Sequence, residues 1–165
     1  MSRLLVVHHS PTRSMTALTD AVVAGAHDPE ITGVDVVVRA ALEATAADVL
    51  AADGYLLGTP ANFGYMSGAL KHFFDTTFLQ VGGSLSDTGA PDAARGRSSG
   101  KPFGLHVHGR YDTTGAVRSV LSIVGALGWS QGYGVVEVLG DVTAADTEAA
   151  YELGATIAAL VAERG

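Results

Sequence analysis

The stretch that decides the fold spans residues 54–78 and reads GYLLGTPANFGYMSGALKHFFDTTF. It opens with a short apolar run, continues through a loop with three glycines and a proline, and ends with apolar residues at intervals of three and four. A short apolar run bounded by glycine predicts a buried strand, whereas the longer spacing predicts a helix with one buried face. The stretch therefore predicts a strand, a loop whose glycines allow close approach of another group, and a helix.

The same alternation of strand and helix recurs along the chain. Five apolar runs predict strands at residues 3–8, 34–38, 54–59, 102–107 and 134–139. Helical spacing separates them, and Thr45 with Asp48 and Thr143 with Asp146 show the capping-box pattern of a helix start. Alternating strands and helices predict an α/β fold in which a parallel sheet carries helices on both faces.

The composition limits the classes of protein to consider. The 165 residues suit one domain spanning 1–165, and no apolar run reaches the roughly 20 residues that span a bilayer. The chain has no cysteine, so redox chemistry would need a bound cofactor. A net charge of −7 without a basic cluster disfavours nucleic acid and anionic membranes as partners. The N-terminus lacks a signal-peptide pattern, so we expect a cytoplasmic protein.

Three unusual loops follow the first, third and fourth predicted strands, whose carboxyl ends meet at the ligand-binding edge of such a sheet. The first loop, residues 9–16, places four hydroxyl side chains where a helix begins. A helix N-terminus has unpaired N–H groups and a partial positive charge, so this loop predicts a phosphate-binding site. An ordinary helix cap with extra surface hydroxyls is the alternative.

The second loop, residues 58–68, combines glycines, a proline and two aromatic residues directly after a buried strand. This composition suits a backbone that lies against a flat ring while an aromatic side chain covers it. The motifs Gly-Thr-Pro, Asn-Phe-Gly and Met-Ser-Gly, with Leu-Lys and Phe-Phe-Asp in residues 70–75, make the stretch similar to the flavin-ring loop of the flavodoxin family. The resemblance is closest to FMN-dependent NAD(P)H:quinone reductases of the tryptophan-repressor-binding-protein type. A glycine-rich connector with a helix cap at Ser67 is the alternative.

The resemblance implies a three-layer, doubly wound, flavodoxin-like sheet of five parallel strands in the order 2-1-3-4-5, with non-covalently bound FMN as cofactor. It implies that the first loop holds the phosphate, and that main-chain N–H groups near residues 62–64 meet the N5 and O4 edge of the flavin. The third loop, residues 106–115, would bind the pyrimidine edge, although it departs from the family's glycine run with serine or threonine. The residues that the resemblance assigns to the cofactor are Ser10, Thr12, Arg13, Ser14, Met15, Thr16, Thr59, Pro60, Ala61, Asn62, Phe63, Gly64, Tyr65, Met66, His108, Gly109, Arg110, Tyr111 and Asp112.

Two residues of the third loop, His108 and Tyr111, are candidate catalytic residues. Both would lie at the mouth of the flavin site, where a proton donor assists reduction of a quinone oxygen. Simple packing against the flavin edge is the alternative. Histidines also bind metals, but His8 and His106 fall inside apolar strands and carboxylates are sparse near them, so we expect no metal site.

Other features carry narrower predictions. Asp75 lies four residues after Lys71, a spacing that favours an ion pair, so it receives no catalytic role. Ser67 does not fit the spacing of a hydrolase nucleophile. Residues 80–100 are too long for an ordinary loop, which predicts a lid, an oligomer contact or a flexible insertion. The basic residues considered for the 2′-phosphate of NADPH are Arg95, Arg97, Lys101 and Arg110.

Three functions are compatible with these residues. The first is an FMN oxidoreductase that passes hydride or electrons from NAD(P)H to a quinone or another small acceptor. The second is a flavodoxin-type carrier that exchanges electrons with a protein partner and has no turnover of its own. The third is a flavin-free binding module, since a fold does not fix a function. The resemblance also suggests a homo-oligomer, either a dimer or a tetramer.

Overall fold

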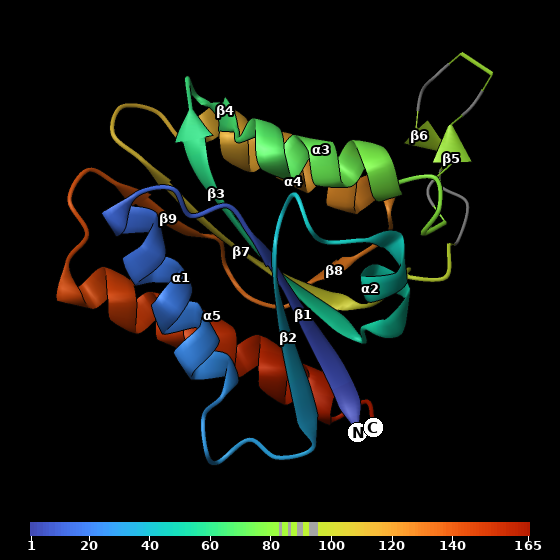
Figure 1. The fold of residues 1–165 in the computed structure, drawn as a ribbon, viewed down its shortest axis with the longest axis horizontal. Helices are drawn as coiled ribbons and strands as arrows, with labels where there is room; N and C mark the ends of the chain where they lie inside the picture. Colours follow the sequence, from blue (N-terminus) through green and yellow to red (C-terminus); the bar gives the residue numbers. More distant parts are fainter. Residues whose placement is uncertain (83, 86, 89–90, 93–95) are drawn as a thin grey trace.

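Strands and helices alternate in the computed structural model, which describes residues 1–82, 84–85, 87–88, 91–92 and 96–165 (Figure 1). The longer strands are β1 (Ser2–His8), β2 (Val34–Ala40), β3 (Gly54–Asn62), β7 (Pro102–Gly109) and β9 (Val136–Leu139). The two-residue strands are β4 (Tyr65–Met66), β5 (Ser84–Leu85), β6 (Pro91–Asp92) and β8 (Ser130–Gln131). The helices are α1 (Arg13–Ala26), α2 (Ala46–Ala51), α3 (Gly68–Thr77), α4 (Thr114–Ala126) and α5 (Ala144–Ala162). Both predicted capping boxes, at the starts of α2 and α5, are present.

The main sheet has the predicted strand order. β2, β1, β3 and β7 are parallel neighbours, and β8 and β9 share the fifth position because both pair with β7. This is the 2-1-3-4-5 order of a doubly wound, flavodoxin-like α/β fold. β9 begins at Val136, two residues later than predicted, whereas β3 and β7 continue beyond their predicted ends at residues 59 and 107. The strands therefore extend into the loops that we expected to be irregular.

Helices cover both faces of the sheet, and each face has its own core (Figure 1). On β1, Leu4 and Val6 pack in the core under α1 and α5, whereas Leu5 and Val7 pack in the core under α2, α3 and α4. Full burial of one such side chain contributes roughly 1.5–3 kcal/mol. Burial on both faces explains why the strands are continuous apolar runs and not alternating patterns.

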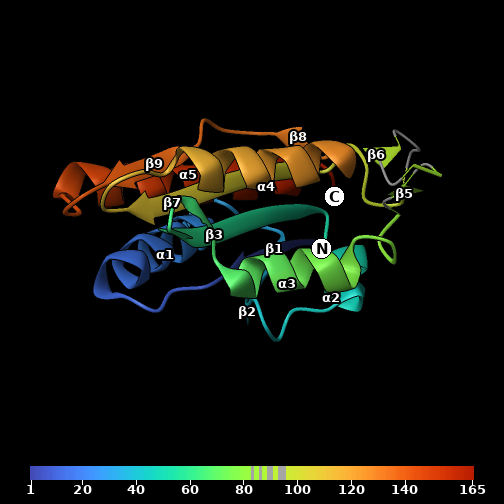
Figure 2. The ribbon, with the colours of Figure 1, turned by 90° about the horizontal axis from the view of Figure 1, so that it is seen from above.

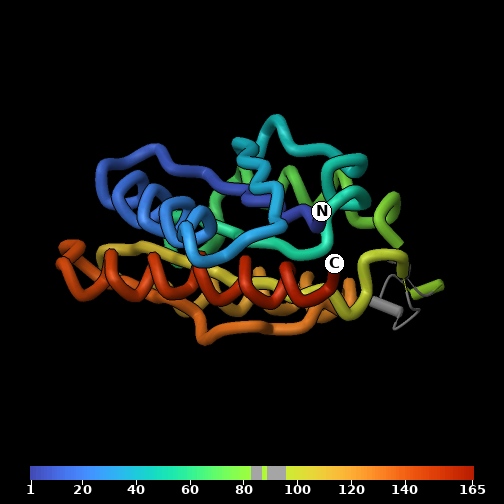
Figure 3. Tube along the Cα trace, turned by 90° about the horizontal axis from the view of Figure 1, so that it is seen from below, coloured from blue at the N-terminus to red at the C-terminus, as the bar shows by residue number. Residues whose placement is uncertain are grey.

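α1 and α5 lie side by side on their face of the sheet (Figure 3). Their backbones approach most closely at two glycines. A Cβ on Gly25 would lie 1.9 Å from the carbonyl oxygen of Tyr151, and a Cβ on Gly154 would lie 1.9 Å from that of Val22. A larger residue at either position would push the helices apart, so this contact fixes α1 and the loop that precedes it.

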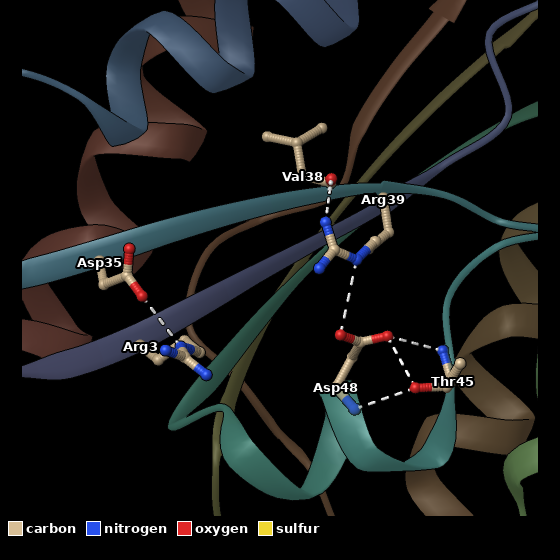
Figure 4. A network of polar contacts seen from close by, with 6 residues as sticks. All are labelled: Arg3, Asp35, Val38, Arg39, Thr45 and Asp48. Atoms are coloured by element: carbon tan, nitrogen blue, oxygen red, sulfur yellow. Dashed lines mark hydrogen bonds and ion pairs between the residues drawn. The ribbon is translucent and has the colours of Figure 1, made fainter.

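Polar contacts tie the edge strand β2 to its neighbours (Figure 4). The Nε of Arg3 donates to Oδ2 of Asp35 at 3.0 Å, across the β1–β2 pair. Arg39 forms an ion pair with Asp48 at 3.5 Å, and the same carboxylate accepts the N–H and hydroxyl of Thr45. Exposed ion pairs contribute at most about 1 kcal/mol each, so their main effect is to hold the start of α2 beside β2.

The segment of residues 80–100 falls only partly within the described residues. Its described part contains the antiparallel pair β5–β6, which lies beyond the C-terminal end of α3 (Figures 1 and 2). β4 lies at the opposite end of α3, where the helix begins (Figure 1). The described part of the segment therefore does not cover the carboxyl ends of the strands as the predicted lid would, and the oligomer contact stays a prediction.

Candidate functional site

The carboxyl ends of β1, β3 and β7 surround a hollow of about 290 Å³. All three predicted loops contribute to its wall. The first loop contributes Thr12, Arg13 and Ser14, the second contributes Pro60, Ala61 and Asn62, and the third contributes His108, Gly109 and Arg110. Residues that are far apart in the sequence are thus brought together at the edge where doubly wound sheets bind ligands.

The N-terminus of α1 faces this hollow and has no carboxylate in its first turn. The hydroxyl of Thr12 accepts the N–H of Met15 at 3.2 Å, and the N–H of Thr16 donates to the carbonyl of Thr12. Within the described part of the chain, this leaves the N–H groups of Arg13 and Ser14 unpaired. By contrast, α2 and α5 each have an aspartate in the first turn. The start of α1 is therefore suited to an anion.

The side chains of three predicted phosphate residues lie outside the lining of the hollow. Met15 is fully buried. Thr16 is exposed, and its hydroxyl donates to the carbonyl of Ser10 at 3.4 Å. The hydroxyl of Ser10 contacts Nδ1 of His8 at 2.9 Å and the hydroxyl of Thr19 at 2.8 Å. Thr12, Arg13 and Ser14 line the hollow, whereas the side chain of Ser10 connects the loop to residues beneath it.

The second loop is a hairpin in which β4 pairs with the end of β3. Phe63 and Gly64 form its turn, with φ values of 52° and 76°, and Asn62 pairs with Tyr65. A positive φ is ordinary for Gly64 but unfavourable for Phe63, which has a Cβ. The side chain of Phe63 is fully exposed, so burial does not compensate for this conformation. Strain of this kind is concentrated at ligand-binding positions.

Thr59 and Ser67 close the base of the hairpin. The hydroxyl of Thr59 accepts the N–H of Ser67 at 2.9 Å, and the hydroxyl of Ser67 accepts the N–H of Leu70 at 3.1 Å at the start of α3. The side chains of Thr59 and Met66 are buried. Tyr65 is partly exposed and lines a separate hollow beside α4. These four residues shape the hairpin from below or behind and do not line the hollow.

The third loop is tied to the turn between β9 and α5. His108 donates its Nε2–H to the carbonyl of Gly140 at 2.7 Å, because a carbonyl can only accept. The N–H of Gly140 donates to the carbonyl of Gly109 at 2.8 Å, and Arg110 forms an ion pair with Asp141 at 2.9 Å. These contacts hold the third loop in place and keep the guanidinium of Arg110 at the rim of the hollow.

A second hollow, of about 460 Å³, shares Ala61, Asn62 and Arg110 with the first. Its other lining residues are Phe63, Gly64, Tyr111 and Asp112. The side chain of Tyr111 is 94% exposed, and that of Phe63 is fully exposed. Two exposed aromatic side chains from different loops offer apolar surfaces to a flat ligand.

His8 and His106 are the ends of a hydrogen-bonded chain beneath the first loop. The hydroxyl of Thr19 lies 2.9 Å from Nε2 of His106, and the chain continues through Ser10 to His8. Burial, together with the charge of His8, lowers the pKa of His106 to about 3, so this imidazole is neutral. Sequence reasoning missed the chain. The sequence signal that could have revealed these contacts is Thr19, a polar residue that lies beside Leu18 on the buried face of α1.

Within the ranges that the structure describes, no three side chains of the metal-binding types lie close enough to hold a metal ion. The predicted ion pair between Lys71 and Asp75 is present at 2.6 Å. Among the described helices, none is long and apolar enough to cross a membrane.

Of the basic residues considered for a 2′-phosphate, Arg110 lies at the hollows. Arg95 lies outside the described residues. Lys101 immediately precedes β7, at the opposite end of the strand from His108, and its Nζ binds the carbonyl of Ala52. Arg97 donates to a main-chain carbonyl near the end of α3. Lys101 and Arg97 thus lie away from both hollows, and a contact of either residue with a 2′-phosphate stays a prediction.

Comparison with known proteins agrees with this fold. The structure is similar to that of the WrbA-like flavodoxin from Agrobacterium tumefaciens, with a TM-score of 0.72 and 22% identity over 99% of both chains. A flavodoxin from Streptococcus pneumoniae gives a TM-score of 0.73 at 22% identity, over 97% of this chain and all of the other. The fold is therefore that of the flavodoxin-like proteins. Residues 14–137 match the NADPH-dependent FMN reductase family, and the chain belongs to that family.

Two relatives match over part of their length. A flavodoxin from Aquifex aeolicus is 34% identical over 85 residues, which are 52% of this chain and 45% of that protein. An NAD(P)H dehydrogenase (quinone) from Acidithiobacillus ferrooxidans is 32% identical over 97 residues, covering 47% of this chain and 48% of that protein. The matches thus span about half the length of each relative.

Proposed function

We propose that this chain, acting as one domain over residues 1–165, holds FMN without a covalent bond and passes hydride or electrons from NAD(P)H to a quinone or another small acceptor. Membership of the NADPH-dependent FMN reductase family supports this activity. The observation that carries the proposal is a pair of adjoining hollows with the start of α1 at one end and two exposed aromatic side chains at the other. A molecule with a phosphate at one end and a flat ring at the other matches this arrangement.

The first loop would hold the phosphate. The unpaired N–H groups of Arg13 and Ser14 provide main-chain donors, and the guanidinium of Arg13 provides a charged one. The hydroxyl of Thr12 uses a lone pair to accept the N–H of Met15, so its own proton is available for a phosphate oxygen. The donors in this part of the hollow therefore fit a phosphate.

The second and third loops would hold the ring. Phe63 and Tyr111 offer their faces, while Asn62, Gly64 and Asp112 complete the wall. Among the described residues, a Cβ on Gly64 would meet only the carboxylate of Asp112, at 3.7 Å, so this side of the turn is open to a ligand. Main-chain N–H groups of the turn are then the donors for the polar edge of the ring.

Bound FMN supplies the centre that accepts and donates hydride or electrons. The protein's part is to bind the acceptor and to provide a proton. Tyr111 is suited to this, because its side chain is exposed at the rim of the second hollow. His108 has committed its Nε2–H to Gly140, so only its Nδ1 is available to exchange a proton with an acceptor.

Arg110 is the proposed contact for the 2′-phosphate of NADPH. It lines both hollows, and its present partner is Asp141, whose side chain is largely exposed. An exposed ion pair contributes at most about 1 kcal/mol, so a phosphate competes well for this guanidinium. The Arg110→Gln variant should lose preference for NADPH over NADH.

A flavodoxin-type carrier is the second candidate, and the Aquifex aeolicus flavodoxin favours it. A carrier would hold FMN in the same hollows but would receive electrons from a protein partner. Reduction of the bound flavin by NADPH in the absence of other proteins separates the two functions. The carrier reading predicts no such reduction.

Binding of FMN and of riboflavin tests the proposed site. Charge-assisted hydrogen bonds to the phosphate contribute about 1.5–3 kcal/mol, so FMN should bind at least tenfold more tightly than riboflavin. Equal binding of both would contradict the phosphate site on the first loop. Failure to bind either would overturn the proposed function.

A further inference from the structure

The hydrogen-bond chain beneath the first loop runs from His8 through Ser10 and Thr19 to His106. It has three contacts, which is more than the two hydroxyl protons of Ser10 and Thr19 can supply. The heavy-atom distances are 2.9 Å from His8 Nδ1 to Ser10, 2.8 Å from Ser10 to Thr19 and 2.9 Å from Thr19 to His106 Nε2. Each of the three contacts needs one proton. Ser10 and Thr19 supply one proton each, so at least one imidazole must donate.

The number of donating imidazoles decides where the Ser10 proton goes. If one imidazole donates, all three protons are used within the hydrogen-bond chain, and the hydroxyl of Ser10 has no proton left to donate to a ligand. If both donate, one hydroxyl proton is left over, and it is the Ser10 proton when Thr19 donates to Ser10. His106 is fully buried and neutral, so its ring carries a single N–H, and it contributes at most one donor through Nε2.

We propose that His8 takes up a proton from solvent when an anion binds at the first loop, and that Ser10, whose hydroxyl lies beneath the residues that line the hollow, carries the coupling by turning its proton from the hydrogen-bond chain toward the anion. The inference rests on the proposed function, in which the anion is the phosphate of FMN. A protonated His8 always has an Nδ1–H to donate to Ser10. Its positive charge, two residues from Ser10, favours the anion as well.

Few other charges act on His8. His9 follows it on the chain, Asp20 faces it from α1, and His106 faces it from β7. Its neighbours on β2 and β3 are an alanine and a glycine. Burial and the adjacent His9 lower the pKa of His8, whereas Asp20 raises it. The imidazole is thus neutral near pH 7 until an anion approaches.

NMR titration of the His8 ring, with and without saturating sulfate, tests the coupling. Sulfate is a suitable probe because it stays a dianion between pH 5 and 8. The pKa of His8 should rise by about 0.5–1 unit, which corresponds to sulfate binding about three- to tenfold more tightly to the protonated protein. In Ser10→Ala the rise should fall below half of this value, whereas the control His72→Gln, at an exposed histidine on α3, should retain it.

A His8 pKa that saturating sulfate leaves unchanged would overturn the coupling. If the pKa of His8 rises as much in Ser10→Ala as in the wild type, the role of Ser10 is overturned. Ser10→Gly removes the same hydroxyl and replaces the alanine variant if that variant does not fold. Amide signals of Arg13 and Ser14 that do not respond to sulfate at any pH would contradict the inference as well. FMN binding, measured separately at pH 7.5, distinguishes failure of the proposed function from failure of this coupling.

Discussion

Gly115, in the first turn of α4, lies so close to Gly64 that a Cβ on Gly115 would be 2.2 Å from the carbonyl oxygen of Gly64. This contact sets the turn of the β3–β4 hairpin against α4. It thereby places Phe63 beside the third loop, where both line the second hollow. The proposed ring-binding part of the site therefore depends on helix packing as well as on the hairpin's own sequence.

The Gly115→Ala variant should displace the hairpin turn. Alanine normally stabilises a helix relative to glycine, but here the added methyl group meets a backbone oxygen that cannot move alone. We expect affinity for both FMN and riboflavin to fall by about tenfold or more, because the ring position changes. Gly125→Ala in the same helix is the control, since no described residue outside the helix's own backbone lies within 4 Å of its Cβ position. Equal flavin affinity in both variants would contradict the role of this contact.

Replacing Phe63 should preserve the stability of the fold but weaken flavin binding. Its φ of 52° is tolerated better by asparagine than by phenylalanine, and its exposed ring loses no packing when removed. Phe63→Asn should therefore keep or slightly raise the melting temperature. The same variant should bind FMN and riboflavin about two- to tenfold more weakly, because ring contacts of this kind contribute about 0.5–1.5 kcal/mol. Unchanged affinity would show that Phe63 does not cover the ring.

The hydroxyl of Thr12 should both stabilise the start of α1 and contribute to phosphate binding. Thr12→Val removes the cap on the N–H of Met15, which costs about 1 kcal/mol of unfolding free energy, and it removes a donor from the hollow. FMN affinity should fall by about tenfold while riboflavin affinity stays constant. The matched control is Thr45→Val, which removes the corresponding cap of α2. If both variants lose FMN affinity equally, the effect is on stability and not on the phosphate.

His106 should make the protein sensitive to acid. Burial and His8 lower its pKa to about 3, whereas in the unfolded chain it is about 6.5. Between these values the unfolded state binds one more proton, so stability falls as the pH drops below about 6.5, by up to about 1.4 kcal/mol per pH unit. Chemical denaturation from pH 7 to 4 should show a shallower fall in His106→Gln than in the wild type. The exposed His72→Gln variant should keep the steep fall, and identical slopes in all three proteins would contradict this role.

Tyr111 and His108 should differ in catalysis. Tyr111→Phe removes the exposed hydroxyl, and if that group donates a proton, kcat with a quinone should fall by at least tenfold with little change in FMN affinity. His108→Ala removes the hydrogen bond to Gly140 that holds the third loop, so it should lower FMN affinity by a larger factor than it lowers kcat. Stopped-flow measurement of flavin reoxidation by the quinone checks the effect on turnover, and titration with FMN checks the effect on affinity. Unchanged turnover in both variants would remove them as proton donors.

The fold could be predicted because its signals are local. Apolar runs and the capping boxes at Thr45 and Thr143 are read directly from short windows, and they agree with the structure. The ends of β3 and β7 were harder to place, because their pairing continues into residues with loop-like composition. Glycine and proline after Gly58 predicted an irregular loop, whereas contacts with β7 and α4 make it a hairpin.

The site was predictable only in part for a similar reason. The hydroxyls near the start of α1 predict a phosphate loop, but the sequence does not show that the Ser10 side chain turns inward to Thr19. That bond depends on His106, which is distant in sequence and reaches α1 only through the sheet topology. The contacts of Gly140 and Asp141 with the third loop were missed because the predicted strand order does not specify which individual atoms of neighbouring loops meet.

The most direct test of the central claim is the visible absorption of the FMN-loaded protein during anaerobic addition of NADPH and then of a quinone. The proposed function predicts that the flavin bands bleach with NADPH and return with the quinone in the same cuvette. A bound flavin whose bands NADPH leaves unchanged would contradict the NAD(P)H-dependent oxidoreductase.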